Sequence, residues 1–139
     1  MSTIENIKTW FERAVPEPTD KNRATQAGCH AEEFAEMLEA FGYLKHALDV
    51  EQLADYLKKS CTGIDANEVN REDLLDVLCD QIVTAIGVGH MFGMDVFGAL
   101  AEVNRSNWSK FVAGHPVFDE NGKIAKPVSY TPPDLTPFV

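Results

Sequence analysis

The sequence predicts an all-α fold: a bundle of four or five helices with a short C-terminal β-hairpin and an extended arm. Apolar residues recur at three- and four-residue spacing in several segments before residue 112. These segments begin at residues that cap helices well. Beyond residue 115 the pattern changes, because five of the seven prolines lie there. We therefore expect one domain, with a helical catalytic part at residues 1–112 and the hairpin and arm at 113–139.

The first two predicted helices have clear boundary signals. Ser2 and Glu5 have the spacing of a capping box, in which each side chain bonds the main-chain N–H group of the other residue. The two prolines within residues 16–18 end this helix. Thr19 or Asp20 then caps the second helix.

The second predicted helix extends to Phe41 and has two distinct faces. At 3.6 residues per turn, one side is an apolar stripe made of Ala27, Ala31, Phe34, Leu38 and Phe41. Another side carries polar side chains and a thiol, namely Asn22, Gln26, Cys29, His30, Glu33 and Glu36. An apolar stripe of this kind is typical of a helix face that packs against its neighbours.

Further helices follow along the chain. A short helix is capped by Asp49, and a long one starts at Asp65 or Asn70. Asp95 caps the last helix. The Asp-Glu-Asn-Gly sequence at 119–122 predicts the turn of a β-hairpin, and the tail beyond it is expected to be extended.

The composition argues against several classes of protein. A net charge of −10 disfavours unspecific binding to nucleic acid, whose phosphates attract Lys and Arg. No apolar run approaches the roughly 20 residues that a membrane helix needs, and the N-terminus lacks the features of a signal peptide. The three cysteines do not have zinc-site spacing. We expect a soluble, cytoplasmic protein with no nucleic-acid or membrane partner.

Two of the long helices each place acidic residues on one face. Glu33 and Glu36 lie three residues apart, and Asp76 and Asp80 lie four apart, so the carboxylates of each pair repel one another. Such a face alone is usually solvated surface. If the two helices pack together, four carboxylates converge, and a hard cation such as Mg²⁺ would stabilise them. A di-iron site fits less well, because the second acidic helix has no histidine at matching spacing.

Residues 26–38 contain a Glu-Glu-x-x-Glu sequence that resembles the metal-binding helix of the all-α NTP pyrophosphohydrolases. That superfamily includes MazG, dimeric dUTPase and phosphoribosyl-ATP pyrophosphohydrolase. The strongest likeness is to single-domain, phosphoribosyl-ATP-pyrophosphohydrolase-like proteins of bacteria and phages. Further elements follow in the family's order: an Asp helix at 75–80, Asn-x-Ser-Lys at 107–110 and Gly-Lys-x-x-Lys-Pro at 122–127. The resemblance covers roughly residues 10–135.

This resemblance implies an enzyme that uses Mg²⁺, with Mn²⁺ as a substitute, to split an NTP or dNTP into the monophosphate and pyrophosphate. It implies that the metal ligands are Glu33, Glu36, Asp76 and Asp80. Glu32 or Glu33 would orient or deprotonate the attacking water. The family's second motif is usually Glu-x-x-Asp, whereas Val77 stands three residues before Asp80. We therefore expect Asp76, four residues before Asp80, to replace the usual Glu, with Asp73 or Glu72 as a stand-in.

The same resemblance implies a set of substrate-binding residues. The candidates are Asn22, Gln26, His30, Asn104, Asn107, Lys110, Lys123, Lys126 and Tyr130. The three lysines lie where the family contacts phosphates, and Tyr130 is a candidate for stacking on the base. Family members assemble, so a homodimer or homotetramer is expected. The rival interpretations are an acidic helical interaction protein and a DNA mimic, neither of which explains the two C-terminal lysine motifs.

Overall fold

The computed structural model describes residues 1–139 and contains five α-helices, one π-helical turn, one 3-10 turn and no β-strand. The predicted all-α class is therefore confirmed. The chain forms two compact units. The α1–α4–α5 unit consists of Met1–Pro16, Val69–Val117 and Ile124–Val139, and the α2–α3 unit consists of Glu17–Glu68 and Phe118–Lys123. The predicted boundary at residue 112, between a helical catalytic part and a hairpin with an extended arm, stays a prediction.

Helix α1 spans Thr3–Ala14 and begins with the predicted capping box. The hydroxyl of Ser2 accepts from the N–H of Glu5 at 3.3 Å, and the Glu5 carboxylate accepts from the N–H of Ser2 at 2.6 Å. The helix packs on α5, which spans Val96–Trp108 and is capped by Asp95 as predicted. Trp10, which is buried, anchors this contact, because its indole N–H donates to the main-chain oxygen of Asn107 at 3.0 Å.

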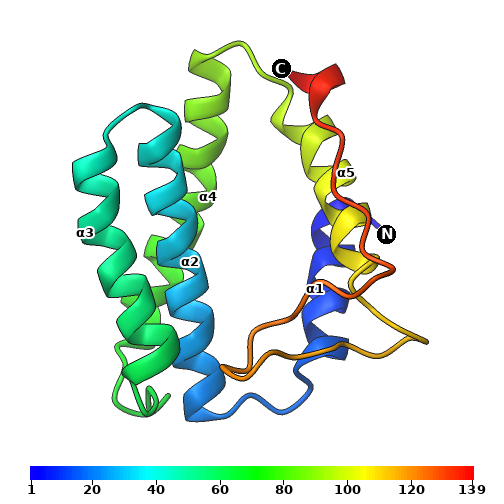
Figure 1. Ribbon diagram of the computed structural model, residues 1–139. Coiled ribbons are helices and arrows are strands. Elements are labelled where there is room, and N and C mark those ends of the chain that lie inside the picture. The colour runs from blue at the N-terminus through cyan, green and yellow to red at the C-terminus, as the bar shows by residue number, and fades with distance from the viewer. The chain divides into compact units, whose positions relative to one another are not determined.

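Helix α2 spans Asp20–Ala40, with Thr19 as its cap, and packs along α3 in the same unit (Figure 1). The side chains that these two helices bury are small: Ala24, Ala35, Ala47 and Ala54. Small side chains let two helix backbones approach closely and leave little room for larger ones. For this reason the predicted apolar stripe is only partly buried, and Phe34 is 50% exposed.

The predicted start of the third helix at Asp49 is wrong. Helix α3 spans Leu44–Asp55 and follows α2 almost immediately, because Gly42, at φ +84°, reverses the chain. No side chain caps its N-terminus at Tyr43. Helix α3 then continues directly into a π-helical turn, η1, at Tyr56–Ser60.

Helix α4 spans Arg71–Met91, and the structure selects Asn70 as its cap. Within its unit α4 contacts α5 alone among the helices, and Gly89 is its only buried residue. Many of its apolar side chains are therefore exposed, among them Leu75, Ile82 and Val83. By length and composition α4 could also cross a membrane, but one such helix is weak evidence for a membrane protein.

The predicted β-hairpin is not formed, since the chain has no strand. The predicted turn does occur: the N–H of Gly122 donates to the oxygen of Asp119 at 3.1 Å. The Asp119 carboxylate also accepts from the N–H groups of Asn121 and Lys123. Two main-chain bonds also join the arms of the turn, from the N–H of Asp119 to the oxygen of Lys123 at 2.8 Å and from the N–H of Ala125 to the oxygen of Val117 at 2.7 Å, but no strand is formed. The tail contains no α-helix, as predicted, but it has a turn in which the N–H of Tyr130 donates to the oxygen of Pro127 at 2.9 Å, and a 3-10 turn, η2, at Thr136–Phe138.

Candidate functional site

The carboxylate of Glu32 on α2 is held by two lysines of the α2–α3 unit. The ammonium of Lys58 lies 2.8 Å from Oε2 of Glu32, and that of Lys123 lies 2.9 Å from the same oxygen. The side chain of Lys58 is only 10% exposed, whereas that of Lys123 is 40% exposed. Two positive charges therefore meet at one oxygen atom.

Lys58 reaches Glu32 because of a close helix approach at Gly28. Lys58 sits in the π-helical turn, and its aliphatic stem passes directly over α2. A Cβ atom at position 28 would lie 2.6 Å from Cγ of Lys58 and 2.9 Å from the main-chain oxygen of Ala54. The ammonium of Lys21 donates to the main-chain oxygens of Lys58 and Cys61 and so fastens the end of this turn to α2. Glycine at position 28 is thus a packing requirement.

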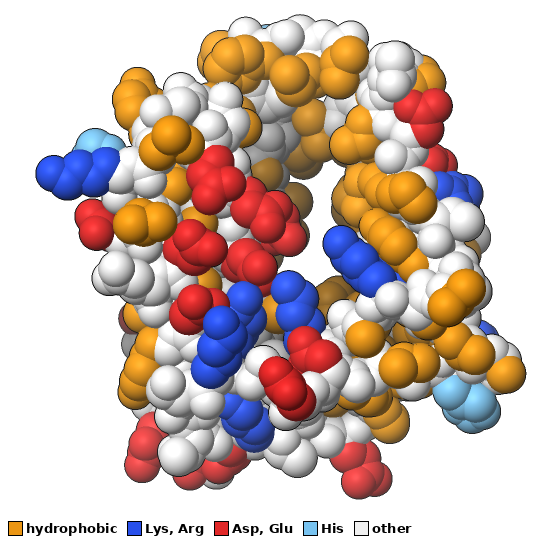
Figure 2. Space-filling view, in the orientation of Figure 1, with side chains coloured by type: hydrophobic (Ala, Val, Ile, Leu, Met, Phe, Trp, Pro, Cys, Tyr) orange, Lys and Arg blue, Asp and Glu red, His pale blue; other side chains and the backbone are white.

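The glutamates of α2 differ in their electrostatic surroundings. Burial raises the pKa of Glu32, but the hydrogen bonds and charges of Lys58 and Lys123 outweigh it, so that its pKa is lowered overall. Partial burial, followed by the charges of Glu33 and Glu32, raises the pKa of Glu36. Figure 2 shows acidic side chains gathered over α2 with basic side chains next to them. The Glu33–Glu36 side of α2 thus has unbalanced negative charge.

The donor set of Glu33 and Glu36 fits Mg²⁺. Both side chains are exposed, and they lie three residues apart on α2, which places them on neighbouring positions of one face. Mg²⁺ is usually bound through one or two carboxylates together with waters and substrate phosphates, so such a pair is compatible with Mg²⁺. No group of three or more His, Cys, Asp or Glu side chains that could hold a metal ion occurs in the structure. Asp76 and Asp80 are exposed on α4 in the other unit, so their convergence with Glu33 and Glu36 stays a prediction.

The predicted substrate residues of the α2–α3 unit differ in their surroundings. Asn22 completes the cap of α2, because its side-chain oxygen accepts from the main-chain N–H and the hydroxyl of Thr19. Gln26 and His30 are exposed on the same helix. Lys123 lies against Glu32, so the structure brings one predicted phosphate contact together with one predicted catalytic carboxylate.

In the α1–α4–α5 unit, two predicted substrate residues contribute to helix packing. The amide of Asn104 donates to Oδ1 of Asn6 at 2.6 Å. The same oxygen accepts from the indole N–H of Trp108 at 2.6 Å, so Asn6 joins α1 to α5 twice. Asn107 contributes its main-chain oxygen to Trp10.

Three further candidates, Lys110, Lys126 and Tyr130, come together in this unit. The ammonium groups of Lys110 and Lys126 lie 5.8 and 5.3 Å from the centre of the Tyr130 ring. These distances allow cation–π attraction. The Tyr130 ring thus has two cationic neighbours, Lys110 and Lys126, which are 16 residues apart in the sequence.

The tail is attached to α5 by polar contacts. Glu102 receives two bonds from Arg105 and one from the N–H of Asp134. These hydrogen bonds lower the pKa of Glu102 to about 2. The hydroxyl of Ser106, which is buried, donates to the oxygen of Thr131 at 2.8 Å. Thr131 and Asp134 therefore have a structural role, because their main-chain groups attach the tail to α5.

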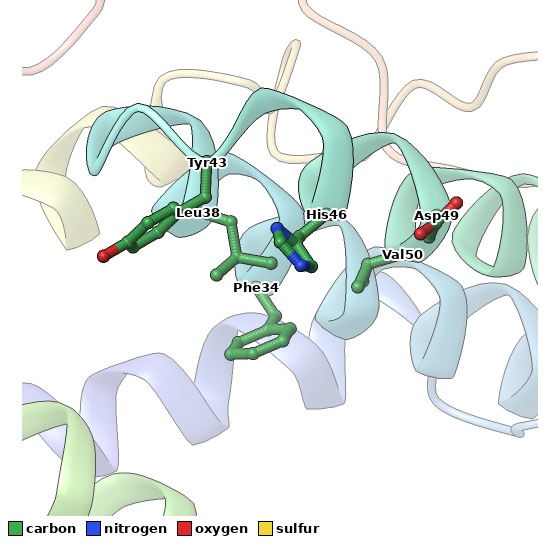
Figure 3. Close-up of a pocket in the computed structure, with 6 residues that line it drawn as sticks. All are labelled: Phe34, Leu38, Tyr43, His46, Asp49 and Val50. Atoms are coloured by element: carbon green, nitrogen blue, oxygen red, sulfur yellow. The ribbon is translucent and has the colours of Figure 1, made fainter.

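An open pocket of about 470 Å³ lies between α2 and α3 (Figure 3). It is lined by Phe34, Leu38, Tyr43, His46, Asp49 and Val50. The lining is mainly apolar, and none of the predicted site residues belongs to it. The pocket therefore does not add to the acidic face of α2.

No protein-family model, curated protein or solved structure matches the chain. The resemblance to the pyrophosphohydrolases thus rests on the motifs themselves.

The sequence analysis did not identify two residues that make important contacts: Lys58, which pairs with Glu32, and Asn6, which joins α1 to α5. Lys58 stands beside Lys59 near a helix end, where lysines are common on solvated surface. The available signal was Gly28, since a glycine inside a helix costs about 1 kcal/mol relative to alanine and often marks a close approach. Nothing in the sequence marked Asn6.

Proposed function

We propose that the protein is a Mg²⁺-dependent nucleoside triphosphate pyrophosphohydrolase. The observation that carries this proposal is the contrast of charges along α2. The carboxylates of Glu33 and Glu36 are exposed on this helix, and the ammonium groups of Lys58 and Lys123 reach it from other segments at Glu32. A metal–triphosphate complex offers the matching chemistry, with a cation for the acids and phosphate oxygens for the lysines. The ordered family motifs give independent support from the sequence.

The residues take distinct roles in this proposal. Glu33 and Glu36 would hold the Mg²⁺, which when bound neutralises phosphate charge and polarises the phosphorus–oxygen bond. Glu32 already has two lysine partners, so Glu33 is better suited to orient the attacking water. Lys123 contacts phosphate oxygens of the substrate. The products are a nucleoside monophosphate and pyrophosphate.

The complete site requires a helix bundle in which α4 brings Asp76 and Asp80 to the acidic face of α2. Asp76 and Asp80 are four residues apart, whereas Asp73 and Asp76 have the three-residue spacing of the family's usual motif. In the structure the Asp73 carboxylate is engaged by the Asn70 amide at the start of α4. We therefore assign the metal role to Asp76 and Asp80, with Asp73 as the position to test beside them.

We also propose that the protein assembles as a homodimer or homotetramer. Exposed apolar side chains along α4, such as Leu75 and Val83, are costly in water and support a covering partner. With its charge of −10, the protein is proposed to act on free nucleotides of the cytoplasm.

The test is a panel of canonical and damaged NTPs and dNTPs with Mg²⁺, in which monophosphate and pyrophosphate are both quantified. At least one triphosphate should yield the two products in equal amounts. Glu36→Gln should reduce turnover by about 100-fold or more, while Glu51→Gln on α3 serves as the control and should retain it. Release of orthophosphate and a diphosphate, or no hydrolysis of any member of the panel, would overturn the proposal.

A further inference from the structure

Lys58 is a buried cation to which the sequence analysis assigned no role. We propose that Lys58 and Lys123 together form a binding site for one phosphate group of the substrate and of the pyrophosphate product. In the free protein Glu32 is the internal ligand that holds the two ammonium groups in place. This inference rests on the proposed function for the identity of its ligand, but the site itself follows from the contacts of Lys58.

The two ammonium groups retain hydrogen-bonding capacity beyond Glu32. Each lysine ammonium carries three N–H donors. Lys58 and Lys123 both contact a single oxygen of Glu32, and Lys58 lies a further 3.8 Å from an oxygen of Asp55. Two positive charges share one carboxylate oxygen, so the charge of Glu32 alone does not balance them. A phosphate group, with several acceptor oxygens, fits this arrangement.

The burial of Lys58 indicates that its position is built into the fold. An ordinary surface ion pair needs no special backbone, as Lys59 shows: it is 54% exposed and pairs with Asp55 one helical turn away. Lys58 instead requires Gly28 beneath its stem and the π-helical turn that directs it across α2. A cation fixed in this way loses little side-chain entropy when it binds a ligand.

The turn that carries Lys123 is fastened to the same helix. The hydroxyl of Thr25, a buried residue on α2, donates to the main-chain oxygen of Asn121 at 3.3 Å. Asp119 accepts from the N–H groups of Asn121 and Lys123 and shapes the turn locally. Lys123 thus reaches Glu32 from a supported turn, although it lies 91 residues away in sequence.

The position of the site beside Glu33 predicts that anion binding depends on Mg²⁺. Without the cation, the carboxylates of Glu33 and Glu36 repel a phosphate that approaches the lysines. Glu33 and Glu36 would hold the cation, which would offset their negative charge, so that one phosphate group could bind there and the next could bind Lys58 and Lys123. Pyrophosphate is the smallest molecule that contains both groups, so it is the appropriate probe.

The experiment is calorimetric titration of inorganic pyrophosphate into the full-length protein, with excess Mg²⁺ or with EDTA. Wild type should bind in Mg²⁺ and at least 10-fold more weakly in EDTA. Lys58→Met keeps the stem over Gly28 but removes the charge, and should weaken binding at least 10-fold in Mg²⁺. Lys59→Met, one residue along the same turn, should change binding less than 2-fold.

A second variant guards against a folding defect in Lys58→Met. Lys123→Met changes a half-exposed side chain on a surface turn, and should also weaken binding at least 10-fold while the melting temperature and helical circular dichroism stay at wild-type values. If Lys123→Met and a folded Lys58→Met bind pyrophosphate as tightly as wild type, the inference is wrong, even if the enzyme hydrolyses triphosphates. If no triphosphate is hydrolysed but pyrophosphate binding depends on both lysines, the proposed function is wrong and the phosphate site is supported.

Discussion

Gly28 of α2 lies directly beneath the side chain of Lys58, with no room for a Cβ atom between them. An alanine at position 28 would press on Cγ of Lys58 and on the main-chain oxygen of Ala54, neither of which is a freely moving chain end. We therefore expect Gly28→Ala to lower the free energy of unfolding by roughly 1–3 kcal/mol, despite the better helix propensity of alanine. Chemical denaturation measures this change.

The matched control is Gly87→Ala on α4, where a Cβ atom would meet nothing within 4 Å. There only helix propensity acts, so the protein should gain roughly 0.5–1 kcal/mol. A neutral or stabilising effect of Gly28→Ala would show that α2 and the π-helical turn are not in close contact.

Asn6 holds two polar groups of α5 through a single oxygen, that of its side-chain amide. Asn6→Leu leaves the Asn104 amide and the Trp108 indole N–H without this acceptor, and should cost roughly 1–3 kcal/mol of stability. Asn6→Asp keeps an oxygen in the same place and should retain most of it. Thermal unfolding of the two variants compares them directly, and equal destabilisation by both would contradict this role of the oxygen.

The contacts of Glu102 predict a pH dependence of stability. Hydrogen bonds from Arg105 and from the N–H of Asp134 lower its pKa from 4.5 to about 2 in the folded protein. A lowered folded-state pKa contributes stability that is fully present above the unfolded value and is lost as the pH falls from about 4.5 to 2. Glu102→Gln should therefore be less stable than wild type at about pH 6, and this difference should shrink towards pH 2.

Denaturant midpoints across this pH range measure the effect, with Glu120→Gln in the exposed turn as the control. A gap between wild type and Glu102→Gln that stays constant with pH would show that the ionisation of Glu102 does not fasten the tail to α5.

Metal binding by the acidic faces should be visible as stabilisation without any substrate. A cation at about 100 times its dissociation constant, bound by the native state only, adds roughly 2.7 kcal/mol to the free energy of unfolding. Millimolar Mg²⁺ or Mn²⁺ should raise the melting temperature by several degrees beyond the effect of matched ionic strength. Glu36→Gln should lose this increment, because it removes one of the two carboxylates of α2 that are proposed to bind the metal.

Asp80→Asn separates the contribution of α4 from that of α2. If the bundle brings Asp80 to the acidic face, this variant also loses the metal-induced shift and melts at or above wild type without metal, since one repelling charge is gone. A full shift in Asp80→Asn together with none in Glu36→Gln would place the metal on α2 alone.

The exposed side of α4 predicts an assembly larger than a monomer. Val83 is 65% exposed within a run of apolar side chains, and Val83→Lys should break up an assembly that covers it. Asn67→Lys, in the loop before α4, introduces the same charge outside the helix and should leave the assembly intact. Light scattering after size-exclusion chromatography gives the mass, and a monomeric wild type would contradict the proposed oligomer.

Features set by near neighbours in the sequence were predictable. The caps at Ser2, Thr19 and Asp95 depend on residues within three positions, and all three are present in the structure. The start of α3 was missed because Tyr43 provides no side-chain cap, whereas Asp49, inside the helix, looks like one. The hairpin was over-predicted: the turn is present, but its two arms share only two main-chain hydrogen bonds and form no strand.

The candidate site was predictable in its residue types and not in its pairings. The spacing on α2 identified Glu33 and Glu36, and the motif identified Lys123. The partners of Glu32 lie 26 and 91 residues away, at distances over which sequence periodicity carries no information. The predicted apolar stripe of α2 included large side chains. The residues that α2 and α3 bury are instead small, mainly alanines and Gly28, and the apolar pattern did not predict this.

The π-helical turn makes the direction of Lys58 depend on the number of residues in the segment as well as on their identity. A π-helical turn contains one residue more than an α-helical turn, and each residue of an α-helix rotates the chain by about 100°. If one residue were deleted between Tyr56 and Lys58, the segment could revert to an α-helix, and Lys58 would turn away from Gly28 and Glu32. A change in the length of this segment would thus separate the lysine from Glu32 while every side chain of α2 stayed in place.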